Sequence, residues 1–534
     1  MELKRWPRWV WASVWGLVLV AWSMSLGCSG CGSDGRDDGA FVVLMDASPH
    51  GLDPRFATTD ASAKLVALMH EGLISTDTQD GTMEYRLARS VEQTSPTTYE
   101  IELRDDARFH DGEPVTARDV EYTYMTLDEV GSPLAGLNER IKEFDIIDDH
   151  RFVLELKEPH APFENDLGMG ILPRHICEGH RTCPGEPVGA GPFQFAERDG
   201  ELYFAFEAFE DHFETPPAIE RLVFRVIRDD NARMLALLGQ TADLAQNAVP
   251  PLMLPVVEEA EGLQMETAQS FGYTYLAFNL EHPKLSDQKV RQAIAYAINR
   301  DEIIEYKYRG TARPSTGMLV PEHWAYEEDV RTYGYDPAKA RQLLDEAGFP
   351  EDERGVRMEL EFKVSASSFR RSLAQLMAQQ MREVGIEVRV RAFEWGTFFD
   401  DIRSRNFEMT TLQWPSVQEP DLYRWIFHSE NIPTADARAA GANRGAYKNE
   451  RVDELLDKGR VETERDNRRE IYGEVQQILA EELPYISLWH PDNVAVLREG
   501  TQGYYTTPNA RFDALRVVIP ARASEVEMHR DVTP

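Results

Sequence analysis

Residues 358–390 read MELEFKVSASSFRRSLAQLMAQQMREVGIEVRV, and this stretch indicates the fold class. Apolar and polar residues alternate over 358–364 and again over 386–390, as in half-buried strands, whereas 369–384 has the apolar period of a helix. Gly385 follows the helix as its C-terminal cap. A strand, helix, strand unit of this kind joins parallel strands, so the sequence predicts an α/β layer structure.

Segments closer to the N-terminus also have sequence patterns typical of helices and strands. Asp336 and Pro337 open a helix that Gly348 closes. Residues 41–45 are typical of a buried strand, and 61–72 of a helix with Gly72 as its C-terminal cap. Further predicted elements are strands at 98–104 and 151–157 and a helix at 116–127.

The composition is that of a large, acidic globular protein. The 534 residues are 42% hydrophobic, enough to bury large cores, and the length predicts two or three lobes. Asp and Glu number 92 against 57 Lys and Arg, which gives a net charge of −35. A chain so acidic is repelled by phosphate backbones, so nucleic acid is not expected as a partner.

The N-terminus has the layout of a secretory signal. Basic residues precede an uncharged stretch that ends at Gly27, and Cys28 follows. This junction resembles a bacterial lipoprotein signal, although Ser25 stands where such signals usually carry Leu. We expect a signal peptide at 1–27, lipidation at Cys28 and a flexible tether at 28–40, with the body held at the membrane outside the cytoplasm, in the periplasm or its equivalent. An uncleaved membrane anchor is the alternative.

Cys177 and Cys183 are the two cysteines beyond the leader and tether. In an oxidising compartment, two cysteines that close a short loop containing Gly and Pro are expected to form a disulfide. A zinc site made by these cysteines with His175 and His180 is the alternative. The spacing fits no common zinc pattern, so we predict the disulfide and no metal.

Several short motifs, taken in order, resemble the family 5 solute-binding proteins, the group that contains the oligopeptide-, dipeptide- and nickel-binding proteins of ABC importers. The match spans roughly Leu52 to Trp489, and its most telling stretch is Val188 to Phe193. The other motifs include Leu52-Asp53-Pro54, Glu71-Gly72-Leu73, Phe109-His110-Asp111-Gly112, Leu172-Pro173-Arg174-His175, Val290-Arg291-Gln292-Ala293, and Asn443 with Tyr447.

Some of these motifs also predict local structure. His110 is expected to be a hydrogen-bonding residue at a strand end rather than a metal ligand or base. Gly189 and Gly191 are expected in a tight turn where the chain passes between lobes, and they form no phosphate loop because no Gly-Lys-Ser/Thr follows.

The resemblance implies a periplasmic-binding-protein-like type II fold, with two lobes around a cleft and an extra lobe. Ligand would lie between lobes I and III, which close by hinge motion. Such a monomer, without cofactor or catalysis, would capture peptides or peptide-like solutes for the permease subunits and ATPase of an ABC importer. The implied segments are 41–76, 188–278 and 485–520 for lobe I, 77–187 for lobe II, 279–484 for lobe III, and a tail at 521–534.

Two other classes of protein are the rivals. A secreted hydrolase would carry a nucleophile elbow, a zinc helix or a Ser-x-x-Lys set, and none stands in a fitting context. A sensory lipoprotein would keep the binding fold but serve no permease, and the sequence leaves this alternative open.

The expected ligand site lies around Trp414. In the peptide-binding members, a Trp is followed three places later by an Asp that pairs with the peptide's α-ammonium group. Here Val417 occupies that position. A buried ammonium needs a counter-charge, so we predict that Glu419 or Asp421 takes over. Alternatively these acids only solvate a loop, and the cargo is a modified, cationic or sugar-derived solute. Further candidate ligand contacts are Thr58, Asn443 and Tyr447.

Overall fold

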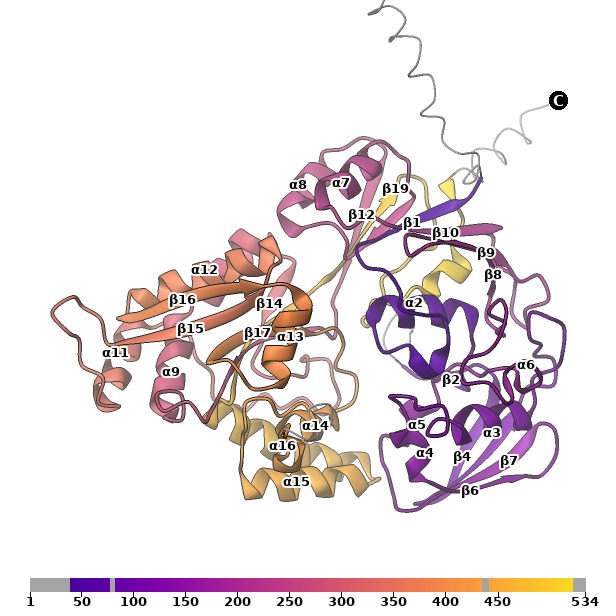
Figure 1. Ribbon diagram of the computed structural model, residues 1–534, viewed down its shortest axis with the longest axis horizontal. Helices are drawn as coiled ribbons and strands as arrows, with labels where there is room; N and C mark the ends of the chain where they lie inside the picture. Colours follow the sequence, from indigo (N-terminus) through magenta and orange to yellow (C-terminus); the bar gives the residue numbers. More distant parts are fainter. Residues whose placement is uncertain (1–38, 77–81, 435–440, 522–534) are drawn as a thin grey trace, which may run out of the picture.

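The computed structural model describes residues 39–76, 82–434 and 441–521, which form three lobes (Figure 1). The predicted signal peptide, Cys28, nearly all of the tether and the tail after residue 521 lie outside the described residues. Within the described ranges, no helix is both long enough and apolar enough to cross a membrane.

Lobe I is built on a seven-stranded sheet with β1 (Phe41–Met45) near its centre. All five residues of β1 are buried, which confirms the strand predicted there. The sheet order is β12 (Leu263–Ala268), β19 (Asn493–Arg498), β11 (Leu244–Gln246), β1, β10 (Arg221–Val226), β9 (Tyr203–Ala208) and β8 (Phe193–Asp199). The other elements are α2 (Asp60–Met69), α7 (Asp230–Leu238), α8 (Leu254–Glu258), η2 (Pro54–Phe56), η3 (Pro251–Met253) and η6 (Asp513–Val517).

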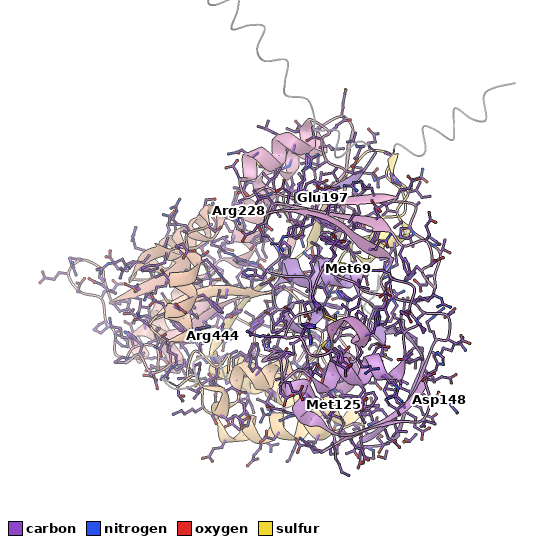
Figure 2. All side chains as sticks on the ribbon, turned by 45° about the vertical axis from the view of Figure 1, so that its right-hand side comes forward. Met69, Met125, Asp148, Glu197, Arg228 and Arg444 are labelled. Atoms are coloured by element: carbon purple, nitrogen blue, oxygen red, sulfur yellow. A yellow bond between two sulfur atoms is a disulfide. The ribbon has the colours of Figure 1, made fainter. Side chains whose placement is uncertain are left out.

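Lobe II contains a four-stranded antiparallel sheet and short helices. Asp148, at a turn between two of its strands, marks the outer edge of this lobe (Figure 2). The sheet order is β4 (Ala88–Ser95), β5 (Thr98–Leu103), β7 (Arg151–Leu156) and β6 (Ile141–Ile146). The other elements are the pair β2 (Ile74–Ser75) and β3 (Glu84–Tyr85), and the helices α3 (Ala117–Met125), α4 (Gly136–Arg140), α5 (Phe163–Asp166) and α6 (Arg174–Cys177).

Lobe III is a six-stranded sheet between two helical layers. The sheet order is β14 (Ala312–Pro314), β18 (Tyr485–Pro491), β13 (Tyr273–Phe278), β17 (Met409–Trp414), β15 (Met358–Ser365) and β16 (Ile386–Phe393). One face packs on α9 (Gln288–Ala297), α11 (Pro337–Glu346) and α12 (Ser368–Arg382), and the other on α14 (Leu422–Phe427), α15 (Glu450–Val461) and α16 (Arg465–Glu482). The remaining elements are α10 (Arg300–Ile303), η4 (Ile304–Tyr308), α13 (Trp395–Arg403) and η5 (Ser429–Asn431).

The strand, helix, strand unit predicted from residues 358–390 is confirmed. β15 and β16 pair in parallel, with Met358 opposite Ile386, and α12 forms the crossover between them. Gly385 has a φ of +87°, the left-handed conformation expected of a residue after a helix. The prediction succeeded here because the pattern of apolar residues agrees with the tertiary packing of each element.

The boundary between lobes I and III differs from the prediction. We placed residues 273–278 and 485–491 in lobe I, but β13 and β18 pair with each other near the centre of the lobe III sheet. The lobes therefore meet at 269–272 and at Asp492. Each crossing is short, with four residues between β12 and β13 and one between β18 and β19. Ser270, Gly272 and Asp492 are typical of any short turn between strands, so they do not mark a lobe boundary.

The junction between lobes I and II explains the Gly189 and Gly191 motif. A Cβ atom at Gly189 would lie 2.0 Å from the carbonyl oxygen of Met69, and one at Gly191 would lie 2.6 Å from that of Leu68. These glycines therefore allow close backbone approach to the end of α2, rather than a turn with positive φ. Met69 itself is fully buried at this junction (Figure 2).

His110 and Gly72 belong to the same junction. The N–H of Gly189 donates to His110 Nδ1 at 3.1 Å, so Nε2 carries the proton and donates to the carbonyl of Gly191 at 3.0 Å. Burial lowers the pKa of His110 to about 4, which keeps the ring neutral. Gly72 is not the helix cap that we expected, because α2 ends at Met69. A Cβ atom at Gly72 would instead meet Gly168 at 2.7 Å.

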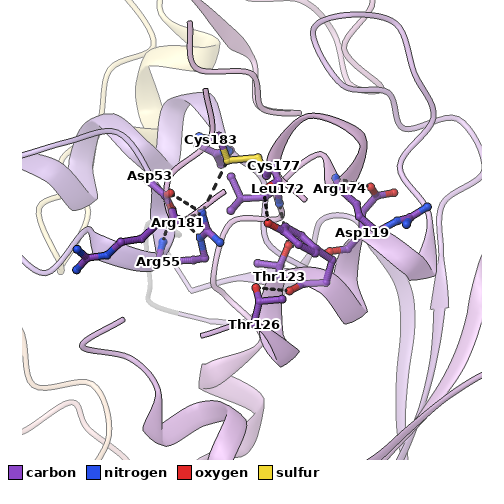
Figure 3. Close-up of a disulfide and its surroundings, with 12 residues drawn as sticks. Asp53, Arg55, Asp119, Thr123, Thr126, Leu172, Arg174, Cys177, Arg181 and Cys183 are labelled. Atoms are coloured by element: carbon purple, nitrogen blue, oxygen red, sulfur yellow. Dashed lines mark hydrogen bonds and ion pairs between the residues drawn. A yellow bond between two sulfur atoms is a disulfide. The ribbon is translucent and has the colours of Figure 1, made fainter. Parts of the chain in front are cut away.

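Cys177 and Cys183 form a disulfide in lobe II, as the sequence predicts (Figure 3). The loop that they close packs on the segment before α2, where Arg55 Nη2 donates to the carbonyl of Arg181 at 3.2 Å. His175 bonds to Asp111 Oδ2 at 2.6 Å, away from the sulfur atoms. Among the residues that the structure describes, no group of three or more His, Cys, Asp or Glu side chains could hold a metal ion.

Candidate functional site

A cavity of about 380 Å³ lies where the three lobes meet. Helix α2 of lobe I lines it with Ala63 and Ala67, one helical turn apart, and both side chains are partly exposed. The volume is typical of a site for a small molecule or a short peptide. The polar lining residues include Asn165 and Asp166 from lobe II, Gln418 and Glu419 from lobe III, and Asn509, Arg511 and Asp513 from the C-terminal part of lobe I.

A second cavity lies wholly inside lobe III, beside Tyr273 and Arg300. Its volume of about 50 Å³ has room for water molecules but not for a peptide. No residue of lobe I or lobe II lines it, so hinge closure would not enclose a ligand there. We therefore take the cavity between the lobes as the candidate site.

Trp414 stands at the edge of lobe III that faces lobe I. It is the last residue of β17, and β17 runs parallel to β15 and β16, so the carboxyl ends of three strands meet at this edge. Ligands of α/β proteins bind at such edges. The Trp414 ring is partly buried and lies 5.6 Å from that of Trp425, centroid to centroid. Trp414 does not itself line the cavity.

Val417, at the position of the acid found in peptide-binding members, is a core residue. It is 2% exposed and packs with Tyr273 and Tyr423 in the apolar core of lobe III. Its N–H donates to the carbonyl of Phe271, in the segment that crosses between the lobes, at 2.9 Å. A carboxylate at this position would lie in the core rather than in the cavity.

Glu419 lines the cavity and joins lobe III to lobe II. Arg468 donates to its Oε1, and Asn165 Nδ2 donates to its Oε2 at 3.2 Å. Burial raises the pKa of Glu419, an effect that the positive charge of Arg468 opposes. A carboxylate has about four acceptor positions, so Glu419 can still accept a bond from a ligand.

Asp421 and Asp166 lie close to Glu419. Burial raises the pKa of both groups, that of Asp166 to about 6, and Arg140 opposes the rise by pairing with Asp166 at 2.9 Å. Asp421 Oδ1 is buried and has no hydrogen-bond partner among the described residues. Asp421 does not line the cavity, so Glu419 is the better placed of the two predicted anchors.

The other predicted ligand contacts occupy different surroundings. Asn443 is buried inside lobe III, where Nδ2 donates to the carbonyl of Tyr447 at 2.8 Å and Oδ1 accepts from the N–H of Tyr447 at 2.9 Å. Tyr447 donates to Glu482 at 2.6 Å. Thr58 is exposed and follows Ala57, which lines the cavity. The structure therefore brings only Glu419 and the neighbourhood of Thr58 to the cavity.

Sequence reasoning missed the lobe II and C-terminal residues of the cavity. Asn165 and Asp166 lie in the four-residue helix α5, and Asn509 and Arg511 lie in an irregular segment, so no periodic pattern surrounds them.

A family model described as "Bacterial extracellular solute-binding proteins, family 5 Middle" matches residues 82–433. The chain belongs to this family. Family 5 proteins bind solutes outside the cytoplasm and are not enzymes as a family, which agrees with the fold and with a cavity between lobes. The predicted family and fold class are thereby confirmed.

Relatives in family 5 extend over almost the whole chain. The oligopeptide-binding protein AppA of Bacillus subtilis is 27% identical over 499 residues, which is 89% of this chain and 90% of the relative. The dipeptide-binding protein of Escherichia coli is 25% identical over 504 residues, 88% of this chain and 92% of the relative.

Solved structures agree with this assignment. The structure of Bacillus subtilis AppA in complex with a nonapeptide has a TM-score of 0.77 at 26% identity and covers 90% of this chain and 98% of that one. The structure of NikZ from Campylobacter jejuni in complex with Ni(L-His) has a TM-score of 0.80 at 24% identity. It covers 90% of this chain and 99% of that one, and at this identity it supports the fold alone.

Proposed function

We propose that this family 5 protein captures short peptides or peptide-like solutes between lobes I and III and delivers them to the permease subunits and ATPase of an ABC importer. The observation that carries the proposal is the cavity lined both by Glu419 of lobe III and by α2 of lobe I. Relatives named for oligopeptide and dipeptide binding cover about nine-tenths of the chain, which adds support.

Glu419, with Asp421 behind it, anchors the peptide's α-ammonium group. The carboxylate of Glu419 is held in place by Arg468 and Asn165, so it is oriented before the ligand arrives. An ammonium group in a closed cavity gains a charge-assisted hydrogen bond from such a carboxylate. Trp414, at the end of β17, lies outside the cavity lining and precedes the anchor by five residues.

Calorimetric titration with mixed short peptides and their N-acetylated forms tests the anchor. Acetylation removes the ammonium charge, so we expect the acetylated forms to bind wild type roughly 10-fold or more weakly. Glu419→Gln should weaken binding of the free peptides by a similar factor, and Asp421→Asn by less. Equal affinity for both forms, with neither substitution having an effect, would show that the anchor is wrong.

A non-peptide cargo is the second candidate. One relative, 24% identical over 510 residues, is named heme-binding protein A of Haemophilus influenzae. Relatives at this level of identity are therefore named for different ligands. If no peptide binds in the titration, this candidate takes the place of the first. Dialysis against lysate, followed by mass spectrometry of the retained compounds, would then identify the solute.

We also propose that Cys28 is lipidated and attaches the protein to the membrane. The support is the basic start, the apolar run and the Gly27-Cys28 junction. Cys28→Ser should release the protein from the membrane fraction or leave it unprocessed, as cell fractionation and the mass of the purified chain will show. A variant that stays in the membrane with its leader intact would identify an uncleaved anchor instead.

A further inference from the structure

Arg511 differs from the other charged residues of the cavity because no carboxylate pairs with it in the part of the chain that the structure describes. Its Nη1 donates to the carbonyl of Ala63 at 3.2 Å, and its side chain lines the cavity. Asn509 lines the same wall. It is 9% exposed, and its Oδ1 is buried without a hydrogen-bond partner among the described residues. Arg511 and Asn509 therefore both have polar atoms that can still form hydrogen bonds with a ligand in the cavity.

The two acids on the same wall, Glu71 and Asp513, share one arginine. Arg516 Nη2 lies 3.3 Å from Glu71 Oε1 and 3.6 Å from Asp513 Oδ1, and Arg516 Nη1 lies 3.2 Å from Glu214 Oε2. Arg516 is itself almost fully buried and does not line the cavity. The positive charge that remains available to a ligand on this wall is therefore that of Arg511.

The part of the cavity lined by lobe III carries the complementary charge. Glu419 comes from lobe III, and its three donors, Arg468, Asn165 and the N–H of Asp421, leave about one of its four acceptor positions free. A ligand that contacts both Arg511 and Glu419 would thus meet a positive group from lobe I and a negative group from lobe III.

We propose that Arg511 and Asn509 bind the terminal carboxylate of a short peptide whose α-ammonium group lies against Glu419. This inference rests on the proposed function and specifies its ligand. The guanidinium of arginine is a planar fork that matches a carboxylate, and the amide of Asn509 adds an N–H donor, since its oxygen and nitrogen positions are interchangeable.

Binding of such a ligand favours the closed arrangement of lobes I and III. Arg511 belongs to lobe I and Glu419 to lobe III, so one zwitterionic ligand contacts both lobes and stabilises the closed arrangement by its contacts there. The cavity volume of about 380 Å³ is near the lower end of the range for ligand sites. The ligand class is therefore short peptides with both termini free.

The test compares each short peptide with its C-terminal amide by calorimetry. Wild type should bind the free acid roughly 10-fold to 100-fold more tightly than the amide, as expected for a hydrogen bond to a charged group. Arg511→Gln should bind both forms with the affinity that wild type has for the amide. Arg511→Lys should recover part of the difference, and Asn509→Ala should reduce it.

Arg198→Gln is the matched control. Arg198 is also a lobe I arginine that donates to a backbone carbonyl, that of Gly200, but it does not line the cavity. This variant should bind as wild type does, and unchanged thermal melting should show that every variant is folded.

The outcomes separate the two proposals. If free acid and amide bind wild type equally while N-acetylation still weakens binding, the carboxylate site is wrong and the proposed function stands. The same holds if Arg511→Gln keeps the full preference for the free acid. If wild type binds no peptide, the proposed function fails and the carboxylate site fails with it.

Discussion

This chain differs from the sequence motif of the peptide-binding members at single positions near the ligand site. Val417 stands where the acid is expected, and the structure puts it in the core of lobe III, where its N–H is bonded to Phe271. The family motif predicted the neighbourhood of the ligand site but not the identity of its acid, because that depends on how the loop after Trp414 packs. Glu419 reaches the cavity two residues later.

Restoring an acid at position 417 should destabilise the protein. The side chain is 2% exposed among apolar neighbours, so Val417→Asp buries a carboxyl group without a partner. We expect the free energy of unfolding to fall by about 3 kcal/mol or more, measured by chemical denaturation. Val417→Thr, with nearly the same shape, should lose less. A stable Val417→Asp variant with improved peptide affinity would contradict the packing described here.

Acidification should weaken peptide binding through Glu419. Its pKa is raised by burial in the free protein, and a bound ammonium group favours the ionised form. The complex therefore holds fewer protons than the free protein, so affinity is complete above the raised pKa and falls as the pH drops through it. Titrations from pH 7.5 downward should show the loss starting at a higher pH than an ordinary Glu would give. Glu419→Gln should lose less affinity than wild type over that range, and what loss remains should come from Asp166, whose pKa burial raises to about 6. A variant as sensitive to pH as wild type would refute this role.

Helices and strands with a clear pattern of apolar residues were predicted well, but the junctions between the lobes were not. β15, α12 and β16 follow from local patterns because each buries one side in its own lobe, and β1 follows from a run of five apolar residues that are all buried. Gly72 was misassigned as a cap, since its close contact with Gly168 arises only in the folded protein. The crossing segments at 269–272 and Asp492 were likewise not predicted, because they are as short as ordinary turns between strands of one sheet.

The disulfide of lobe II should stabilise the protein modestly and leave binding intact. Cys177 and Cys183 are six residues apart, so the bond removes little entropy from the unfolded chain. The double variant Cys177→Ser with Cys183→Ser should lose at most ~3 kcal/mol in unfolding free energy and keep its peptide affinity. Two free thiols in non-reducing peptide mapping of wild type, or loss of binding in the variant, would count against this account.

At the scale of the whole molecule, function depends on residues that the chain order keeps far apart. Ala67, Asn165, Glu419 and Arg511 line one cavity although more than 400 residues separate the first from the last. The family resemblance predicts a ligand between lobes I and III, and residues of both lobes line the cavity. It did not predict the contribution of lobe II, because which side chains meet depends on the packing of three lobes.

The most direct test of the account is to block the cavity. Ala67 lies on the cavity face of α2 and is partly exposed, so Ala67→Trp should fill the space without disturbing the core. Calorimetry should show one short peptide bound per wild-type chain and none bound by Ala67→Trp, with unchanged thermal melting in the variant. If Ala67→Trp binds peptides as wild type does, the ligand does not lie in the cavity beside α2 and the central claim is wrong.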